Sequence, residues 1–295
     1  MKNEKRIYAL GFFDGVHLGH QALLAACCDL AKQQGCGTAA ITFDAHPLSL
    51  FSQQVPTLIS TIRDRCTLLR RFGIGQIHSF CVTKEVMSTP WEVFLENLLD
   101  QGAAGFVCGD DFHFGHRGEG NVQKLAAFCR ARELPCVIVP EQTKDGKRIS
   151  STLIRAFLES GQMQAAAEFL GHPHMLTGVV MHGKKLGRKL GVPTANLSIP
   201  AGIVVPKFGV YVCRAIIDGC SFPAVANVGI RPTVSGSGIT VEPWILDFTG
   251  DLYGKEITLE FYDFLREETK FPDLTALQAQ IHADAAQTRL YFQTH

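Results

Sequence analysis

The alternation of short apolar runs with longer amphipathic stretches is the feature that most restricts the fold of this chain. In the first half, each run of strand length is followed by a stretch whose apolar residues have helical spacing. Strands that alternate with helices in this way form βαβ units, so we predict an α/β domain with a mainly parallel sheet. The expected strands are 7–10, 38–43, 77–82, 105–108 and 136–140, and the expected helices are 20–33, 61–71, 91–99 and 122–132.

The pattern changes after about Gly171, where β-like runs are separated by glycine and proline. Several short strands with such punctuation predict a small all-β barrel, and a final helix is expected at 274–291. The 295 residues fit two domains of roughly 100–200 residues each, which we place at 1–170 and 171–295. Residues 151–170 are expected to form two short helical stretches. The expected barrel strands are 177–181, 210–217, 224–228, 240–248 and 257–262.

Composition describes an ordinary globular protein, with 46% hydrophobic and 19% charged residues and a formal net charge of zero. The neutral balance argues against a nucleic-acid partner. The N-terminal residues lack the apolar core of a signal peptide, and no apolar stretch reaches the ~20 residues of a membrane span. The ten cysteines are scattered, form no CxxC and in part lie in apolar runs. We therefore expect a cytoplasmic protein with reduced thiols and no membrane contact.

The segment from Gly11 to His20 follows the first expected strand and opens the first expected helix. Backbone N–H groups at a helix start attract phosphate, and Gly15 allows a close approach of the backbone to a ligand. His17 and His20 are three residues apart, so in a helical turn they project from one face and can donate to phosphate oxygens. The alternative is that they are helix-cap or surface residues.

Two later segments carry further phosphate-binding chemistry. The hydroxyls of 150–152 cap a helix start, and the arginines on either side of them can grip a phosphate bidentately. Asp111, in Gly-Asp-Asp-Phe-His-Phe-Gly, is a ligand-contacting candidate or a turn residue, and Asp14 is more typical of a turn-former than of a catalyst. The candidates of the 148–155 segment are Arg148, Ser150, Ser151, Thr152 and Arg155.

In the second half, residues 183–196 combine three glycines with four cationic side chains and end in Pro-Thr-Ala-Asn. A mobile loop of this composition suits polyphosphate, although a solvated basic hairpin has the same composition. Pro193 stiffens the turn, and Thr194 and Asn196 offer the oxygen ligands that Mg²⁺ prefers. The polyphosphate candidates of this loop are Gly183, Lys184, Gly187 and Arg188.

These motifs together carry a resemblance. GFFDGVHLGH resembles the HxGH signature of the nucleotidylyltransferase superfamily. With TFDAHP at 42–47, the segments at 109–115 and 148–155, and GVY, NVGIRPT, LYG and FLREE further on, the chain resembles the bacterial bifunctional riboflavin kinase/FAD synthetase family over nearly its whole length. The family usually has proline where this chain has Ala45. The resemblance implies a Rossmann-like nucleotidylyltransferase domain followed by a riboflavin kinase barrel.

The same resemblance implies two reactions, phosphorylation of riboflavin to FMN with MgATP and adenylylation of FMN to FAD with release of pyrophosphate. It implies catalytic roles for His17, His20 and Arg155, a general-base role for Glu242, and Mg²⁺ and ATP binding by Thr194 and Asn196. Riboflavin, FMN and ATP are then the partners of a monomer or weak homo-oligomer. The remaining binding residues that it implies are Gly11, Phe13, Asp14, Gly15, Asp111, Arg148, Ser150, Ser151, Thr152, Gly183, Lys184, Gly187, Arg188, Pro193, Asn227 and Arg266.

Two alternatives stay open at this stage. Pro243 directly follows Glu242, and proline is confined to edges and bulges of a sheet, so the kinase half could be impaired and retained as a flavin-binding module. The second alternative is a non-catalytic, flavin-responsive regulator. That protein would need a partner surface or a nucleic-acid footprint, which the charge pattern does not show.

Overall fold

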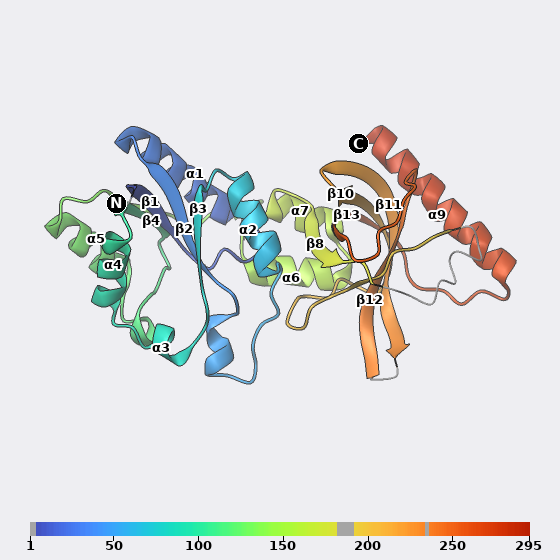
Figure 1. Ribbon diagram of the computed structural model, residues 1–295, viewed down its shortest axis with the longest axis horizontal. Coiled ribbons are helices and arrows are strands. Elements are labelled where there is room, and N and C mark those ends of the chain that lie inside the picture. The colour runs from blue at the N-terminus through green and yellow to red at the C-terminus, as the bar shows by residue number, and fades with distance from the viewer. Residues whose placement is uncertain (1–3, 182–191, 234–235) are drawn as a thin grey trace. The chain divides into compact units, whose positions relative to one another are not determined.

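The computed structural model describes residues 4–181, 192–233 and 236–295, which form two compact units (Figure 1). One unit comprises the described residues up to Leu58 and Ile62–Ser151, and the other comprises Ile59–Thr61 and the chain from Thr152 onward. Each unit is a region whose residues mainly contact one another, and such a region can differ from a domain that folds independently. The domain boundary expected after residue 170 therefore stays a prediction.

The first unit is built on a five-stranded sheet in which every neighbouring pair is parallel, in the order β3-β2-β1-β4-β5. The predicted α/β domain with a parallel sheet is confirmed. The strands are β1 (Arg6–Leu10), β2 (Gly37–Phe43), β3 (Gln76–Phe80), β4 (Ala103–Gly109) and β5 (Cys136–Val139). The helices between them are α1 (Leu18–Gln34), α2 (Ile62–Arg71), the single turn α3 (Lys84–Met87), α4 (Trp91–Asp100) and α5 (Val122–Ala131).

The central strand β1 is buried on both faces, as expected for a parallel sheet covered by helices on each side. Tyr8 and Leu10 pack in one cluster with residues of α4 and α5. Because side chains alternate along a strand, Ile7 and Ala9 point to the opposite face, where α1 packs on β1. Strand order reverses between β1 and β4, and ligands of such sheets bind at the carboxyl ends of the strands beside that switch point.

The second unit contains a six-stranded antiparallel sheet in the order β8-β13-β10-β11-β12-β9. The Met181 N–H donates to the Asn196 carbonyl at 2.9 Å, which brings the two edges together, so the predicted small barrel is confirmed as a nearly closed one. The strands are β8 (His174–Val179), β9 (Leu197–Ser198), β10 (Gly209–Ile217), β11 (Cys220–Thr233), β12 (Gly236–Ile245) and β13 (Glu256–Arg266).

Within residues 151–181, 192–233 and 236–295, three helices accompany the barrel. The predicted short stretches are α6 (Ser151–Ser160) and α7 (Met163–Leu170), and the predicted final helix is α9 (Leu274–Thr294). Asp273 caps α9 by accepting from the Ala276 N–H at 2.8 Å. Ala285 of α9 is buried in one cluster with Val210, Val225 and Leu246 of the barrel unit, which fastens the helix to the sheet.

Strand β11 is much longer than the run 224–228 expected from the sequence. Proline and glycine within it, such as Pro223 and Gly229, have the composition of turns. Pro223 nevertheless pairs with β10, and Gly229 pairs with β12. The hydrogen-bonded ladder therefore overrides the local turn preference.

The ten cysteines are all free, and no helix of the described ranges is long and apolar enough to cross a membrane.

Candidate active sites

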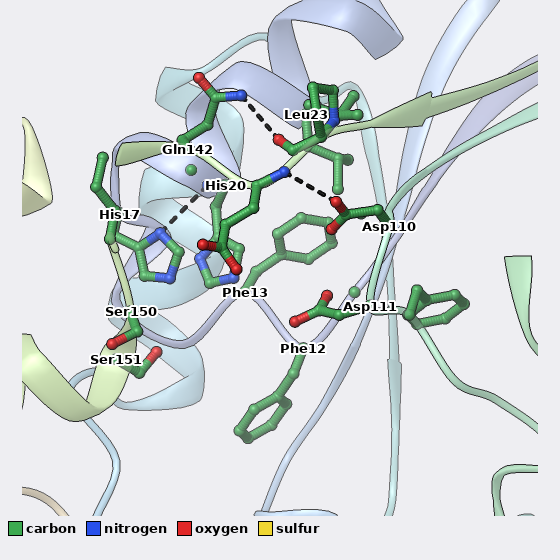
Figure 2. A pocket seen from close by; sticks show the side chains of 18 of the residues that line it. Phe12, Phe13, His17, His20, Leu23, Asp110, Asp111, Gln142, Ser150 and Ser151 are labelled. Carbon is green, nitrogen blue, oxygen red and sulfur yellow. Dashed lines mark hydrogen bonds between the residues drawn. The ribbon is translucent and has the colours of Figure 1, made fainter. Parts of the chain in front are cut away.

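A cavity of about 300 Å³ lies in the first unit, at the carboxyl ends of β1, β4 and β5 (Figure 2). This is the place that the strand order predicts for a ligand. The wall consists of Gly19, Leu23, the two histidines His17 and His20, and residues 10–13, 109–112, 139–142 and 148–151.

His17 and His20 form one side of this cavity, where α1 begins. His17 is the N-cap of α1, and its Nδ1 accepts from the His20 backbone N–H at 3.3 Å. A ring nitrogen that accepts a hydrogen bond carries no proton, so the proton of the His17 ring is on Nε2, which can donate. The two rings are stacked, with centroids 3.6 Å apart. A Cβ at Gly19 would lie 3.2 Å from His17 Cε1, which explains the glycine between the histidines.

The pKa of His20 is strongly perturbed. Burial lowers its pKa well below the ordinary 6.5, and the nearby His17 and Arg65 lower the pKa further. Its Nδ1 is buried and has no hydrogen-bond partner among the described residues. A buried polar atom without a partner is rare and is typical of a functional position.

The turn before α1 is held from below by Arg65 of α2, which is completely buried. Its guanidinium donates to Phe43 O at 2.8 Å and to Thr42 Oγ1 at 3.1 Å, and its Nη2 lies 3.6 Å from Asp14 Oδ1. The same group lies 4.4 Å from the centroid of the Phe12 ring. These contacts keep a turn in which Phe13 has a φ of 58° and Val16 a φ of 42°, both in the left-handed region that non-glycine residues avoid.

The rim of the cavity carries a cation between two carboxylates. Arg148 donates from Nη2 to Asp111 Oδ2 at 2.8 Å and from Nε to Glu141 Oε2 at 2.9 Å. Arg148 is at the end of a short hairpin, β6 (Thr143–Lys144) and β7 (Lys147–Arg148), whose Asp-Gly turn has positive φ at both residues. Asp110 accepts from the Glu141 N–H at 3.1 Å and fixes the neighbouring loop.

Most of the residues predicted for this site come together here, although they are far apart in the sequence. Asp14 and Gly15 differ, because they are buried in the turn beneath the cavity and do not line it. Thr152 and Arg155 belong to the other compact unit, where the Arg155 guanidinium donates to Thr152 Oγ1 at 3.2 Å, and their part in the site stays a prediction. The predicted residues in the lining are Gly11, Phe13, His17, His20, Asp111, Arg148, Ser150 and Ser151.

Sequence reasoning missed Asp110, Glu141 and Gln142, which also line the cavity. The signal for all three was their position directly after the expected strands 105–108 and 136–140. Residues at the carboxyl ends of parallel strands share one edge of the sheet.

A second cavity, of about 270 Å³, lies in the barrel unit. Asn227 of β11 and Glu242 of β12 are directly opposite each other in the ladder, so their side chains lie on one face. Thr194 forms a bridge with Trp244 in the same wall. The lining is Thr194, Val210, Val225, Asn227, Glu242, Trp244, Arg266, Glu268, Thr269, Phe271, Leu277, Ile281 and Asp284.

Pro243 does not turn Glu242 away from this cavity. Pro243 is opposite Ala226 in the β11–β12 ladder, and its carbonyl accepts from the Ala195 N–H at 2.9 Å. Among the described residues, the neighbour on this side of β12 is the short 194–198 segment, so the missing proline N–H interrupts little pairing. The strand has the near-edge position that proline tolerates.

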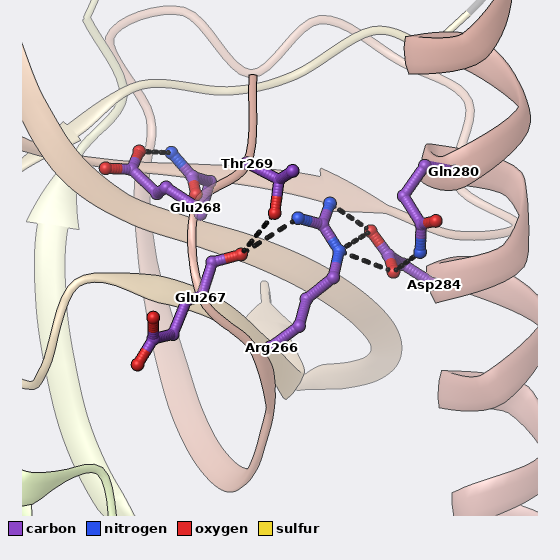
Figure 3. Close-up of polar contacts among 7 residues, drawn as sticks. Arg266, Glu267, Glu268, Thr269, Gln280 and Asp284 are labelled. Carbon is purple, nitrogen blue, oxygen red and sulfur yellow. Dashed lines mark hydrogen bonds and ion pairs between the residues drawn. The ribbon is translucent and has the colours of Figure 1, made fainter. Parts of the chain in front are cut away.

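Arg266 lines the second cavity, and its guanidinium is held by Asp284 of α9 at 2.7–3.2 Å (Figure 3). Glu268, which sequence reasoning did not single out, accepts from the Asn227 amide at 3.0 Å. Trp244 and Asp284 were missed because nothing in their local sequence distinguishes them from residues of an ordinary strand or helix. Glu268 belongs to the FLREE motif, but the motif alone did not show which of its residues reach the cavity.

The other predicted residues of this half are placed differently. Asn196 is buried and Pro193 is exposed, and neither is in the lining. Gly183, Lys184, Gly187 and Arg188 lie outside the described residues.

Comparison with known proteins identifies both halves. A family model described as FAD synthetase matches residues 1–153, and one described as riboflavin kinase matches residues 170–292.

Similar proteins align over almost the entire chain. A bifunctional riboflavin kinase/FMN adenylyltransferase of Listeria monocytogenes is 35% identical over 292 residues, covering 97% of this chain and 92% of that protein. The protein of the same description from Pseudomonas fluorescens is 36% identical over 287 residues, covering 96% and 92%. A Streptococcus pneumoniae crystal structure, described as a macrolide-efflux protein, has a TM-score of 0.85 and 29% identity, covering 98% of this chain and 95% of its own.

We expect Arg65→Met to lower the free energy of unfolding by about 3–5 kcal/mol, because it removes the buried guanidinium that balances the charge of the buried Asp14 carboxylate. Urea denaturation measures the change. Adding Asp14→Asn should restore part of the loss, and Arg70→Met, an exposed arginine of the same helix, should change stability by no more than about 0.5 kcal/mol. A loss of similar size in both arginine variants would contradict the buried pair.

The lowered pKa of His20 predicts a pH dependence of stability. The unfolded chain, with an ordinary histidine pKa, takes up a proton on His20 as the pH falls, whereas the folded chain does not. Protonation therefore favours unfolding, and the free energy of unfolding should fall between about pH 7 and pH 5. Urea denaturation of His20→Gln should show a smaller fall over the same window, and an unchanged slope would exclude His20 as a contributor.

Proposed function

We propose that the two cavities divide two reactions between them, because the chain belongs to the bifunctional riboflavin kinase/FMN adenylyltransferase family. As a member, it phosphorylates riboflavin to FMN with ATP and adenylylates FMN to FAD. We assign adenylyl transfer to the first cavity and the kinase reaction to the second. The observation that carries this assignment is the stacked His17–His20 pair at the start of α1, inside the unit that the FAD synthetase family matches.

In the first cavity, a phosphate oxygen of FMN attacks the α-phosphorus of ATP, and the bond to the bridging oxygen breaks as pyrophosphate leaves. Such a transfer depends on positioning and on stabilisation of the charge on the phosphate oxygens. His17 supplies a donor on Nε2, and the N-terminus of α1 adds its partial positive charge. Both histidines act as hydrogen-bond donors to phosphate and not as nucleophiles.

Arg148, Ser150 and Ser151 line the same cavity and supply further phosphate contacts. Arg148 is exposed and bound by Asp111 and Glu141, and such exposed pairs are weak enough for a phosphate to replace. Gly11 and Phe13 lie against the nucleotide. The resemblance to the family also gives Thr152 and Arg155 a phosphate-binding role, which we include in the proposal.

In the second cavity, the 5′-hydroxyl of the ribityl chain attacks the γ-phosphorus of ATP, and Glu242 takes the hydroxyl proton. Glu242 is suited to this role because it faces a cavity next to a side-chain amide and a threonine hydroxyl. Asn227 contacts the substrate beside it. Arg266 lines the same wall but is ion-paired with Asp284, so it acts on the ligand through the position of that wall.

The donors of the second cavity fit Mg²⁺. Thr194 and Glu242 present oxygen atoms to one space, and Mg²⁺ is usually bound by few protein oxygens together with substrate phosphates. We propose that Thr194 holds the ion from the cavity wall together with Asn196, the buried residue two positions further on, whose part rests on the family resemblance alone. When bound, it neutralises phosphate charge and orients the γ-phosphoryl group.

The remaining parts of the proposal concern the setting of the enzyme. We propose that it acts in the cytoplasm on riboflavin, FMN and ATP, as a monomer or weak homo-oligomer, without a nucleic-acid partner. The zero net charge and the chemistry of both cavities support small-molecule substrates.

The division of labour predicts separable losses. His20→Ala should lower FAD formation from FMN by on the order of 10²-fold or more and leave FMN formation from riboflavin near normal. Glu242→Gln should abolish FMN formation and leave the adenylylation of added FMN intact. Chromatographic separation of the flavins after incubation with MgATP measures both, and each reaction is the folding control for the other. Loss of both reactions in either folded variant would refute the assignment.

The proposed Mg²⁺ ligands predict a shifted metal requirement. Thr194→Val keeps the shape of the side chain but removes its oxygen, so the Mg²⁺ concentration for half-maximal riboflavin phosphorylation should rise by about tenfold. Thr194→Ser keeps the oxygen and should remain within about twofold of the parent. Titration of MgCl₂ at a constant concentration of ATP measures the change, and equal behaviour of the two variants would exclude Thr194 as a ligand.

A further inference from the structure

The segment Arg266–Thr269, which leaves β13, connects two walls of the second cavity (Figure 3). On one side it is fastened to α9. Arg266 donates to both carboxylate oxygens of Asp284, and Gln280 donates to the same carboxylate at 2.9 Å. Asp284 is only 3% exposed, so its carboxylate is shielded from water where it pairs with Arg266.

On its other side the segment is fastened to β11 by Glu268. The Glu268 carboxylate accepts from Asn227 Nδ2 at 3.0 Å. It also lies directly against Gly229, two residues further along the same strand, where a Cβ would be 2.4 Å from Glu268 Oε1 and 3.0 Å from its Cδ. Gly229 is not among the glycines with positive φ. A Cβ at this position would therefore displace the Glu268 carboxylate, whereas the backbone conformation itself would accept one.

This contact determines how the Asn227 amide is turned. Because a carboxylate only accepts, the amide nitrogen must face Glu268, and the amide oxygen faces away from it. Asn227 is directly opposite Glu242 in the β11–β12 ladder, and all three side chains line one cavity. Glu268 thus controls the orientation of the Asn227 amide, the side chain opposite the proposed base Glu242 in the ladder.

We propose that Glu268 is a positioning residue of the kinase reaction, whose carboxylate, seated against Gly229, holds the Asn227 amide in place across from Glu242. The inference rests on the proposed function, which assigns this cavity to riboflavin phosphorylation. Glu268 acts through Asn227 and does not take the substrate proton. Its loss should lower kcat, since a misplaced group near the reacting atoms is costly, and should change the KM for riboflavin little, since the cavity walls remain.

The test uses the full-length chain, with riboflavin phosphorylation measured as kcat and KM. Glu268→Ala should lower kcat by about tenfold with the riboflavin KM within about twofold of the parent. Glu268→Gln keeps an oxygen that accepts from Asn227 and should retain most of the rate. Gly229→Ala should resemble Glu268→Ala, because the new methyl group displaces the end of a flexible side chain without removing the carboxylate.

A double variant separates this role from a general loss of structure. If Gly229→Ala acts by displacing Glu268, it should cause no further loss of kcat in the Glu268→Ala background. Glu267→Ala is the matched control, because it removes an exposed carboxylate of the same segment that pairs with Lys207 and does not line the cavity. Its kcat should equal that of the parent. FMN adenylylation should be unchanged in every variant.

Three results would overturn the inference. They are a kcat of Glu268→Ala within twofold of the parent, an equal loss in Glu268→Gln and Glu268→Ala, or a full additional loss from Gly229→Ala when Glu268 is already alanine. Glu242→Gln is measured in parallel to distinguish the two levels of the argument. If it still phosphorylates riboflavin, the assignment of the cavity fails. If it is inactive while the Glu268 variants keep their kcat, only the positioning role fails.

Discussion

The buried guanidinium of Arg65 is the interaction on which the first site depends. It connects α2 to the ends of β1 and β2 by contacting Asp14, Thr42 and Phe43. Without these contacts, nothing in the local sequence would favour a turn in which phenylalanine and valine adopt left-handed conformations. This turn sets where α1 begins, and therefore where the His17–His20 pair meets a phosphate. Burying the Arg65 guanidinium costs free energy. Its contacts in return fix the backbone of the turn at the ligand site.

The second site depends on strand register instead of a buried charge. Pairing of β11 with β12 brings Asn227 opposite Glu242, and a shift by one residue would turn one of them to the other face. The segment after β13 then reaches back to hold Asn227, while α9 holds that segment through Asp284. The C-terminal helix is therefore part of the site and not only a cover for the barrel.

Much of the fold could be predicted from the sequence because its local patterns agree with its tertiary contacts. The alternation of strands and helices in the first half predicted a parallel sheet, and α1, α2, α4 and α5 begin or end within a few residues of expectation. Prediction was weaker where pairing overrides composition. β11 continues through Pro223 and Gly229, which resemble turn residues in isolation. The doubt whether Pro243 impairs the kinase half had the same origin, since the sequence does not show whether a strand lies at the edge of its sheet.

The sequence by itself determined which chemical groups are available and where the ligand-binding edge of the first unit lies. The strand end, the glycine turn and the two histidines of the segment from Gly11 to His20 are all adjacent in the sequence, so the kind of site could be recognised there. Only the tertiary structure decided which distant groups join them. Asp14 is drawn into a buried pair with Arg65, Arg148 is placed between Asp111 and Glu141, and Glu268 is set against Gly229. Each of these contacts joins residues far apart in the chain, and their approach depends on packing and register, which no local pattern encodes.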